Sequence, residues 1–205
     1  MAITAEMTTN VMELYTAYFN RAADKDGVDY WLNEMDTNGW TVDQVAQSFA
    51  DQAEYTTLYS GMTNTEVVTA VYTNVLNRDA DAAGSAYWVA ELDAGTMAVS
   101  NLIQAVVTAG KEDVDGLGDA AIVANKTAVS QHAYDNNVNT TDTSLAAITA
   151  EAASVTTATD AIDTAVQAAA DAAQAAADAA AAQAAADAAE AEATAAKGAS
   201  FSLAT

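Results

Sequence analysis

The sequence YTAYFNRAADKDGVDYWLNEMD at residues 15–36 returns 57 positions later as YTNVLNRDADAAGSAYWVAELD at residues 72–93. Several polar, turn-forming and aromatic residues match between the two stretches. The matched positions are Asn20–Arg21 with Asn77–Arg78, Asp24 with Asp81, Gly27 with Gly84, Tyr30–Trp31 with Tyr87–Trp88, Glu34 with Glu91, and Asp36 with Asp93. Two copies of one supersecondary unit explain this agreement most simply.

The apolar residues of each copy follow a helical spacing. Val11, Leu14, Tyr15 and Phe19 recur three or four positions apart, which predicts one buried face of a helix. No stretch of the chain alternates convincingly with a period of two. The sequence therefore predicts an all-α fold.

The boundaries of these helices carry their own signals. Residues 24–27 interrupt the first apolar pattern, and Asn38–Gly39 ends the next one. The pairs Thr41–Gln44 and Thr63–Glu66 have the spacing of capping boxes, in which two side chains satisfy free backbone donors at a helix start. We expect one helix to begin at each pair.

Composition divides the chain into four parts. We expect a helical domain with two tandem repeats at 1–112, a connecting helix and loop at 113–142, an Ala-rich long helix or coiled-coil segment at 143–197, and the start of a following, β-rich segment at 198–205. The Ala-rich part carries an a/d heptad seam that runs from Leu145 and Ile148 to Ala180. This seam predicts packing against another helix, from the same chain or from a second copy.

The charge and residue types exclude several classes of protein. Six Lys and Arg against 29 Asp and Glu give a formal net charge of −23, which argues against a nucleic-acid binder. The chain has no Cys and a single His, His132, and it carries none of the common nucleophile, zinc or phosphate-loop motifs. We therefore expect no enzyme. We also expect neither a cleavable signal peptide nor a transmembrane segment, because no basic region followed by an apolar stretch opens the sequence and no apolar run is long enough to span a bilayer.

The repeated pattern Asn-Arg-x-x-Asp-x-x-Gly-x-x-Tyr-Trp has two interpretations. In the structural one, the Asp caps a helix, the Gly turns the chain, the Arg pairs with carboxylates and the Trp fills the core. In the functional one, exposed rings beside acids and amides bind a polysaccharide, because aromatic rings stack on sugars. The candidate polysaccharide-binding residues are Asn20, Arg21, Asp24, Tyr30, Asn77, Arg78, Asp81 and Tyr87. The two interpretations are compatible if one ring of each Tyr-Trp pair is buried and the other exposed.

Carboxylates around the repeated glycines suggest a calcium site. Their alternate spacing resembles the start of an EF-hand loop, although the last ligand position is one place late in both copies. The candidate metal ligands are Asp24, Asp26, Asp29, Asp79 and Asp81. The alternative is that these acids are solvated helix caps.

The repeated unit resembles domain of unknown function 4214, over roughly residues 8–112. Such repeats occur near the N-termini of large bacterial surface-layer (S-layer) and type I-secreted proteins. The resemblance implies a non-catalytic, extracellular module of the cell surface. In the surface-layer group, it implies anchoring of the lattice to lipopolysaccharide, often with calcium. The expected partners are therefore lipopolysaccharide or another surface glycan and further copies in a lattice, with no nucleic acid and no transmembrane segment.

Two other functions remain open from the sequence. The helical part can be a spacer in a secreted adhesin or repeats-in-toxin protein whose binding region lies elsewhere. It can also be a cytoplasmic linker or scaffold, since the family is distantly similar to phycobilisome linker domains. We further expect the chain to be the N-terminal part of a longer protein.

Overall fold

The computed structural model describes residues 2–113, 116–139 and 143–202, with side chains described as far as residue 193. Over these residues the chain forms nine α-helices and no β-strand, which confirms the all-α prediction. The helices are α1 (Ala5–Phe19), α2 (Lys25–Asn38), α3 (Val42–Ala50), α4 (Ala53–Tyr59), α5 (Asn64–Leu76), α6 (Ala82–Asp93), α7 (Val99–Glu112), α8 (Asp119–Asp135) and α9 (Ala152–Ser202). The chain divides into two compact units, Met1–Ile162 and Asp163–Thr205.

Helices α1–α3 form the first repeat and α5–α7 the second, and each repeat turns a sharp corner after its first helix. Asn20 ends α1 with a φ of 49°, and Asn77 ends α5 with a φ of 53°. Both lie in the left-handed region, which Asn tolerates better than most residues. Asp24 and Asp81 then cap α2 and α6 by accepting backbone N–H donors at 2.8–2.9 Å, as the structural interpretation predicts.

The repeated glycine follows each cap because a tyrosine from the preceding helix approaches its backbone. A Cβ atom on Gly27 would lie 2.0 Å from Tyr15 Oη. A Cβ atom on Gly84 would lie 3.3 Å from Tyr72 Oη and 3.1 Å from Asp81 Oδ2. At the first position a side chain cannot be accommodated without displacing the tyrosine, so close packing of the two helices requires glycine there.

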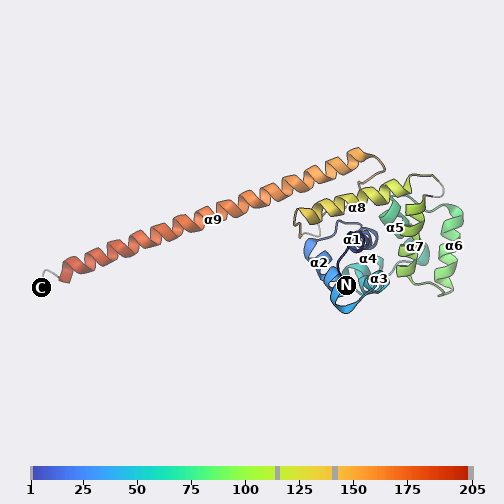
Figure 1. The fold of residues 1–205 in the computed structure, drawn as a ribbon, viewed down its shortest axis with the longest axis horizontal. Coiled ribbons are helices and arrows are strands. Elements are labelled where there is room, and N and C mark those ends of the chain that lie inside the picture. Colours follow the sequence, from blue (N-terminus) through green and yellow to red (C-terminus); the bar gives the residue numbers. More distant parts are fainter. Residues whose placement is uncertain (1, 114–115, 140–142, 203–205) are drawn as a thin grey trace. The chain divides into compact units, whose positions relative to one another are not determined.

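The core of the first unit is built around α1. This helix packs against α2, α3, α4, α5, α7 and α8, and Figure 1 shows it end-on in the middle of the unit. Apolar residues of both repeats join one buried cluster, which includes Tyr18, Phe49, Val71 and Ile103. The two repeats are therefore packed together, and each buries apolar surface that it would otherwise expose.

The first unit extends beyond the two repeats. Helix α8 packs on α1, α5 and α7, so the segment expected to connect domains forms part of the core. The predicted heptad seam also begins later than expected, because Leu145 and Ile148 lie before α9 in an irregular segment. Both side chains are buried, but they do not belong to the long helix as the predicted seam required. We call residues 143–148 the strap.

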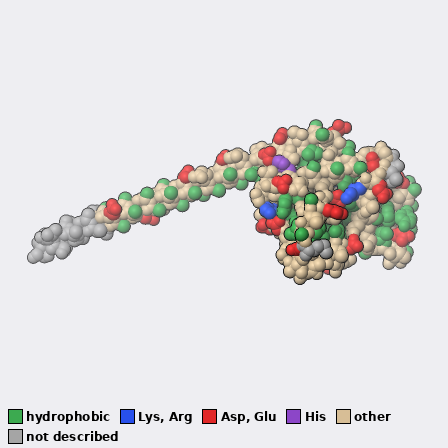
Figure 2. All heavy atoms as spheres, viewed as in Figure 1, with side chains coloured by type: hydrophobic (Ala, Val, Ile, Leu, Met, Phe, Trp, Pro, Cys, Tyr) green, Lys and Arg blue, Asp and Glu red, His purple; other side chains and the backbone are tan. Residues whose placement is uncertain are grey.

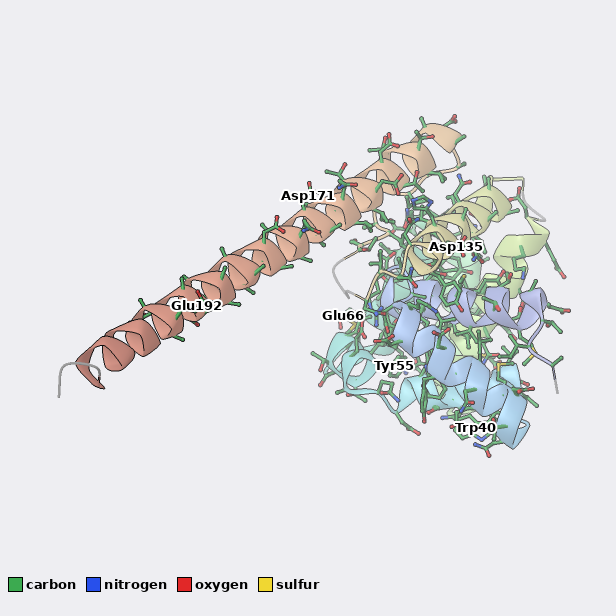
Figure 3. All side chains as sticks on the ribbon, turned by 60° about the vertical axis from the view of Figure 1, so that its left-hand side comes forward. Trp40, Tyr55, Glu66, Asp135, Asp171 and Glu192 are labelled. Atoms are coloured by element: carbon green, nitrogen blue, oxygen red, sulfur yellow. The ribbon has the colours of Figure 1, made fainter. Side chains whose placement is uncertain are left out.

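The second unit is a single helical segment, the part of α9 from Asp163 onward. Its described side chains are exposed except for the half-buried Val166, and Figure 3 shows Asp171 and Glu192 projecting outward. Acidic side chains recur along it in Figure 2. A long Ala-rich helix is confirmed, and helical backbone continues to Ser202 instead of opening a β-rich segment at 198. Residues 203–205 lie outside the described residues.

Among the described residues, no helix combines the length and the apolar character needed to span a bilayer. Helix α9 is long enough but not apolar enough, because acids and glutamines interrupt its alanines at regular intervals.

Candidate functional site

The two Asn-Arg corners meet at one buried lysine. Lys126 of α8 donates from Nζ to Asn20 Oδ1 at 3.0 Å, to Asn77 Oδ1 at 2.7 Å and to the backbone carbonyl of Asn74. Its exposed fraction is 1%. Two predicted binding residues therefore lie together, but they hold an ammonium group inside the protein and do not face solvent with their acceptor oxygens.

The environment of Lys126 is unusual for a charged group. Its hydrogen-bond partners are amide oxygens, with no carboxylate among them. Burial lowers the pKa of Lys126 to about 7, because removal from water disfavours the charged amine. The arrangement ties the matching corners of the two repeats to α8. Sequence reasoning missed Lys126, since nothing in its local sequence distinguishes it from a surface lysine.

The strap covers the same corners from another side. The backbone N–H of Ala22 donates to Thr143 O at 2.8 Å, and that of Leu145 donates to Asn20 O at 3.0 Å. The Asn77 side-chain amide donates to the carbonyl of Ile148. Each corner asparagine is thus engaged both by Lys126 and by the strap, and Asn20 also lines a hollow on the surface.

Arg21 and Arg78 each form a two-pronged ion pair with a carboxylate. Arg21 donates from Nε and Nη2 to Glu54 at 2.8 and 3.0 Å, and from Nη1 to Asp24 at 3.2 Å. Arg78 donates from Nε and Nη2 to Asp119 at 2.9 and 2.6 Å. This agrees with the structural interpretation. The partners come from α4 and α8, outside the repeated motif.

The two tyrosines of the motif are placed differently from its other polar residues. Tyr30 is 54% exposed and Tyr87 is 55% exposed. Each ring packs edge to face on the tryptophan that follows it, with centroids 4.8 Å apart in the first repeat and 4.7 Å in the second. Trp31 is buried and Trp88 is partly buried. One ring of each pair thus faces solvent on a fixed support.

The predicted calcium ligands do not converge. Asp24 and Asp81 serve as helix caps, while Asp29 accepts from Lys25 Nζ at 2.6 Å and from Tyr134 Oη at 2.8 Å. Those bonds lower the pKa of Asp29, with Lys25 the larger cause. Asp26 and Asp79 are exposed. Across the described part of the chain, no group of three or more His, Asp or Glu side chains is placed to hold a metal ion.

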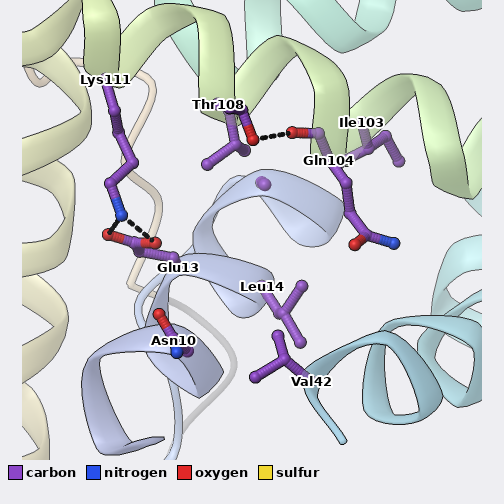
Figure 4. A pocket seen from close by; sticks show the side chains of 10 residues that line it. Asn10, Glu13, Leu14, Val42, Ile103, Gln104, Thr108 and Lys111 are labelled. Atoms are coloured by element: carbon purple, nitrogen blue, oxygen red, sulfur yellow. Dashed lines mark hydrogen bonds and ion pairs between the residues drawn. The ribbon is translucent and has the colours of Figure 1, made fainter. Parts of the chain in front are cut away.

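One hollow of about 520 Å³ on the described surface lies between α1, α7 and α8, and two further hollowed regions lie on the repeats. Of these two, one of about 220 Å³ lies between α1, α3 and α7, over Leu14, Val42 and Ile103 (Figure 4). Lys111 at its edge pairs with both carboxylate oxygens of Glu13 at 2.8 and 2.9 Å, and this pair neutralises its charge. The other region lies in the first repeat beside Arg21 and Glu54.

The family assignment rests on the same two repeats. Residues 5–59 and 46–112 each match the family model described as Domain of unknown function (DUF4214). The chain belongs to the DUF4214 family. The two overlapping matches agree with tandem DUF4214 repeats and end where α7 ends. Comparisons with curated proteins and with solved structures found no match.

Proposed function

We propose that this DUF4214 chain is a non-catalytic domain of a bacterial surface layer that anchors the lattice to outer-membrane lipopolysaccharide. Tyr30 and Tyr87 are the residues that contact the sugar. The supporting observation is that the two repeats expose the same ring at the same position, while the other polar residues of the motif serve internal contacts. A solvent-facing ring held on a second ring offers sugars a rigid apolar surface.

Tyr30 and Tyr87 have different neighbours on their helices, so we expect them to contribute different amounts of binding energy. On α2, Tyr30 lies one helical turn from Asp26, Asn33 and Glu34, whose oxygens can accept hydrogen bonds from sugar hydroxyls. On α6, the corresponding turns around Tyr87 hold Ala83, Ala90 and Glu91. Tyr30 therefore contributes more of the binding energy than Tyr87.

Calcium enters this proposal as a bridging ion. The chain has a net charge of −23, and lipopolysaccharide phosphates are also anionic, so contact requires a divalent cation between them. Exposed carboxylates such as Asp26 and Asp79 are available for such bridges, without a preformed site inside the repeat. The domain acts outside the cell in this proposal, after type I secretion, and self-associates in the lattice.

The test is cosedimentation of the full chain with outer-membrane vesicles that carry full-length polysaccharide, in calcium and in chelator. Vesicles without polysaccharide are the control for the glycan. We expect the double variant Tyr30→Ala/Tyr87→Ala to weaken binding about tenfold, with Tyr30→Ala the larger single effect. Leu117→Ala, which truncates another exposed apolar residue, is the matched control and should bind normally. Equal binding to both vesicle types, or binding unaffected by the tyrosine changes, contradicts the proposal.

A spacer function is the second candidate, and the exposed part of α9 favours it. A helix whose side chains face solvent over residues 163–193, apart from half-buried Val166, can separate two domains without packing on either. Its Gln and Asp side chains pair at a spacing of four residues, as in Gln167–Asp171 and Gln174–Asp178, which supports an isolated helix. If vesicle binding is absent under every condition, the spacer and the cytoplasmic linker or scaffold remain, and the location of the protein in the cell separates them.

A further inference from the structure

The first repeat carries a depression on its surface, beside Arg21 and Glu54. Two adjoining hollows of about 210 and 290 Å³ share Phe19, Arg21 and Glu54. Trp31, Phe49 and Gln52 also line the first hollow, and Asn20, Leu58, Asn74 and Ser144 line the second. Each hollow is smaller than the roughly 300–1,000 Å³ typical of drug-sized ligands, so each suits one small ring.

The polar groups of this depression are fixed in place. The Arg21 guanidinium lies over the rings of Tyr15 and Phe19, at 5.0 and 5.4 Å from their centroids, and its side chain is almost fully buried. It holds Glu54 through two parallel hydrogen bonds. The Glu54 side chain is 42% exposed. A carboxylate has about four lone-pair positions and the fork uses two, so Glu54 presents preoriented acceptors to the depression.

The second repeat shows what the ion pair needs for structure alone. There Leu76 takes the position of Phe19, and Val106 takes that of Phe49. The acid partner of Arg78 is Asp119, whose side chain is 4% exposed. An Arg–carboxylate pair whose role is only to hold the corner can therefore be buried and surrounded by aliphatic residues. The first repeat therefore has an exposed acid, Glu54, and aromatic side chains, Phe19 and Phe49, that are not needed to hold the ion pair.

We propose that the depression binds one pyranose ring of the surface polysaccharide, with the ring on Phe19 and two neighbouring hydroxyls bonded to Glu54 and Gln52. This inference rests on the proposed function and names its sugar subsite. The subsite is continuous with the exposed tyrosine of the same repeat, because Trp31 lines the depression and carries Tyr30 on its edge. A glycan chain stacked on Tyr30 thus reaches the depression across Trp31.

The charge of the depression selects among sugars. Glu54 faces the hollow, and Asp24 lies behind it on the same arginine. An acidic sugar or a phosphate brings a third negative group to this place and is repelled. A neutral or amino-bearing pyranose has hydroxyl or ammonium donors that match the acceptors. The ligand class is therefore a neutral or amino sugar.

The test titrates methyl glucoside, methyl mannoside, glucosamine and glucuronate into the full chain, followed by amide and indole NMR shifts. We expect neutral and amino sugars to shift the Gln52 side-chain amide and the Trp31 indole, and glucuronate to shift neither. Phe19→Leu, which installs the residue found in the second repeat, should weaken binding about two- to tenfold. Glu54→Gln should weaken it about tenfold, and the exposed Gln52→Ala provides a second variant that disturbs no core contact. Glu112→Gln, at an exposed acid of the second repeat, is the control.

The two proposals fail in different ways. Tyr30→Ala tests the anchoring function through vesicle binding, and Phe19→Leu tests the subsite through the sugar-induced shift of the Gln52 side-chain amide. If vesicles bind through polysaccharide but no sugar shifts Gln52 or Trp31, or Phe19→Leu and Gln52→Ala change nothing, the subsite is wrong and the anchoring function stands. If vesicles do not bind, the anchoring function is wrong, and glycoside titration then decides separately whether the depression holds a sugar.

Discussion

In the first repeat, four aromatic rings, those of Tyr15, Tyr18, Phe19 and Trp31, pack around Phe49 with centroids 4.9–5.6 Å apart. In the second repeat the same positions hold Tyr72, Val75, Leu76, Trp88 and, at the centre, Val106. The residues at the helix ends are the same in both repeats, whereas the side chains that fill the core differ. Corners need particular residues because backbone donors and left-handed conformations allow few substitutes, whereas a core accepts different shapes if its volume is filled.

The second helices of the repeats differ in the same sense. Helix α2 buries Val28, Trp31, Leu32 and Met35, and it also contacts α8. Helix α6 has no buried residue. Ser85 takes the place of Val28 there, so one apolar anchor is missing. The same Asp N-cap therefore starts helices that bury very different amounts of apolar surface.

The largest expected effect on stability comes from truncating the central core residue of each repeat, Phe49 or Val106. Phe49→Ala should lower the free energy of unfolding by about 3–5 kcal/mol, because it leaves a cavity among four rings. Val106→Ala removes less apolar surface and should cost about 2 kcal/mol. Urea denaturation of both variants measures the difference. Equal losses would show that the aromatic cluster adds nothing beyond its volume.

A smaller effect tests the lysine that joins the repeats. Burial holds the folded pKa of Lys126 near 7, below its unfolded value of about 10.4. Between these values the unfolded chain binds the proton that the folded chain has released, so stability rises with pH. We expect a gain of about 2 kcal/mol from pH 7 to pH 9, absent in Lys126→Met.

The control for this measurement is Lys111→Met, which removes an exposed lysine and should keep the rise with pH. Tyr15 and Tyr18 act in the opposite direction, because burial raises the pKa of each. Their contribution falls above the unfolded tyrosine value of about 10, outside the chosen window. A wild-type stability that is flat from pH 7 to pH 9 contradicts the assignment to Lys126.

The smallest expected effect on stability comes from exchanging the N-cap residues of α3 and α7 between the repeats. Thr41 forms a complete capping box with Gln44 at the start of α3, whereas Ala98 at the start of α7 makes no side-chain cap bond. Thr41→Ala should cost about 1 kcal/mol, and Ala98→Thr should add about 0.5–1 kcal/mol. Thermal denaturation compares the two. A destabilising Ala98→Thr would mean that the α7 start cannot use a hydroxyl acceptor.

Features that link residues within four positions were predictable from the sequence, namely the helical periodicity, the two capping boxes and the Asp24 and Asp81 caps. The repeat was predictable as well, because its two copies match when the chain is aligned with itself. The pairing of Arg21 and Arg78 with acids was also expected. Their partners Glu54 and Asp119 were not, because many carboxylates were available and only the packing of α4 and α8 selects two of them.

Tertiary structure decided which residues of the repeated motif face solvent. Lys126 reaches Asn20 across 106 positions and Asn77 across 49, and the strap reaches both corners from further along the chain. These contacts turned predicted ligands into internal supports and left Tyr30 and Tyr87 exposed. Burial at such positions depends on which helices cover them, and local sequence patterns do not encode distant coverage.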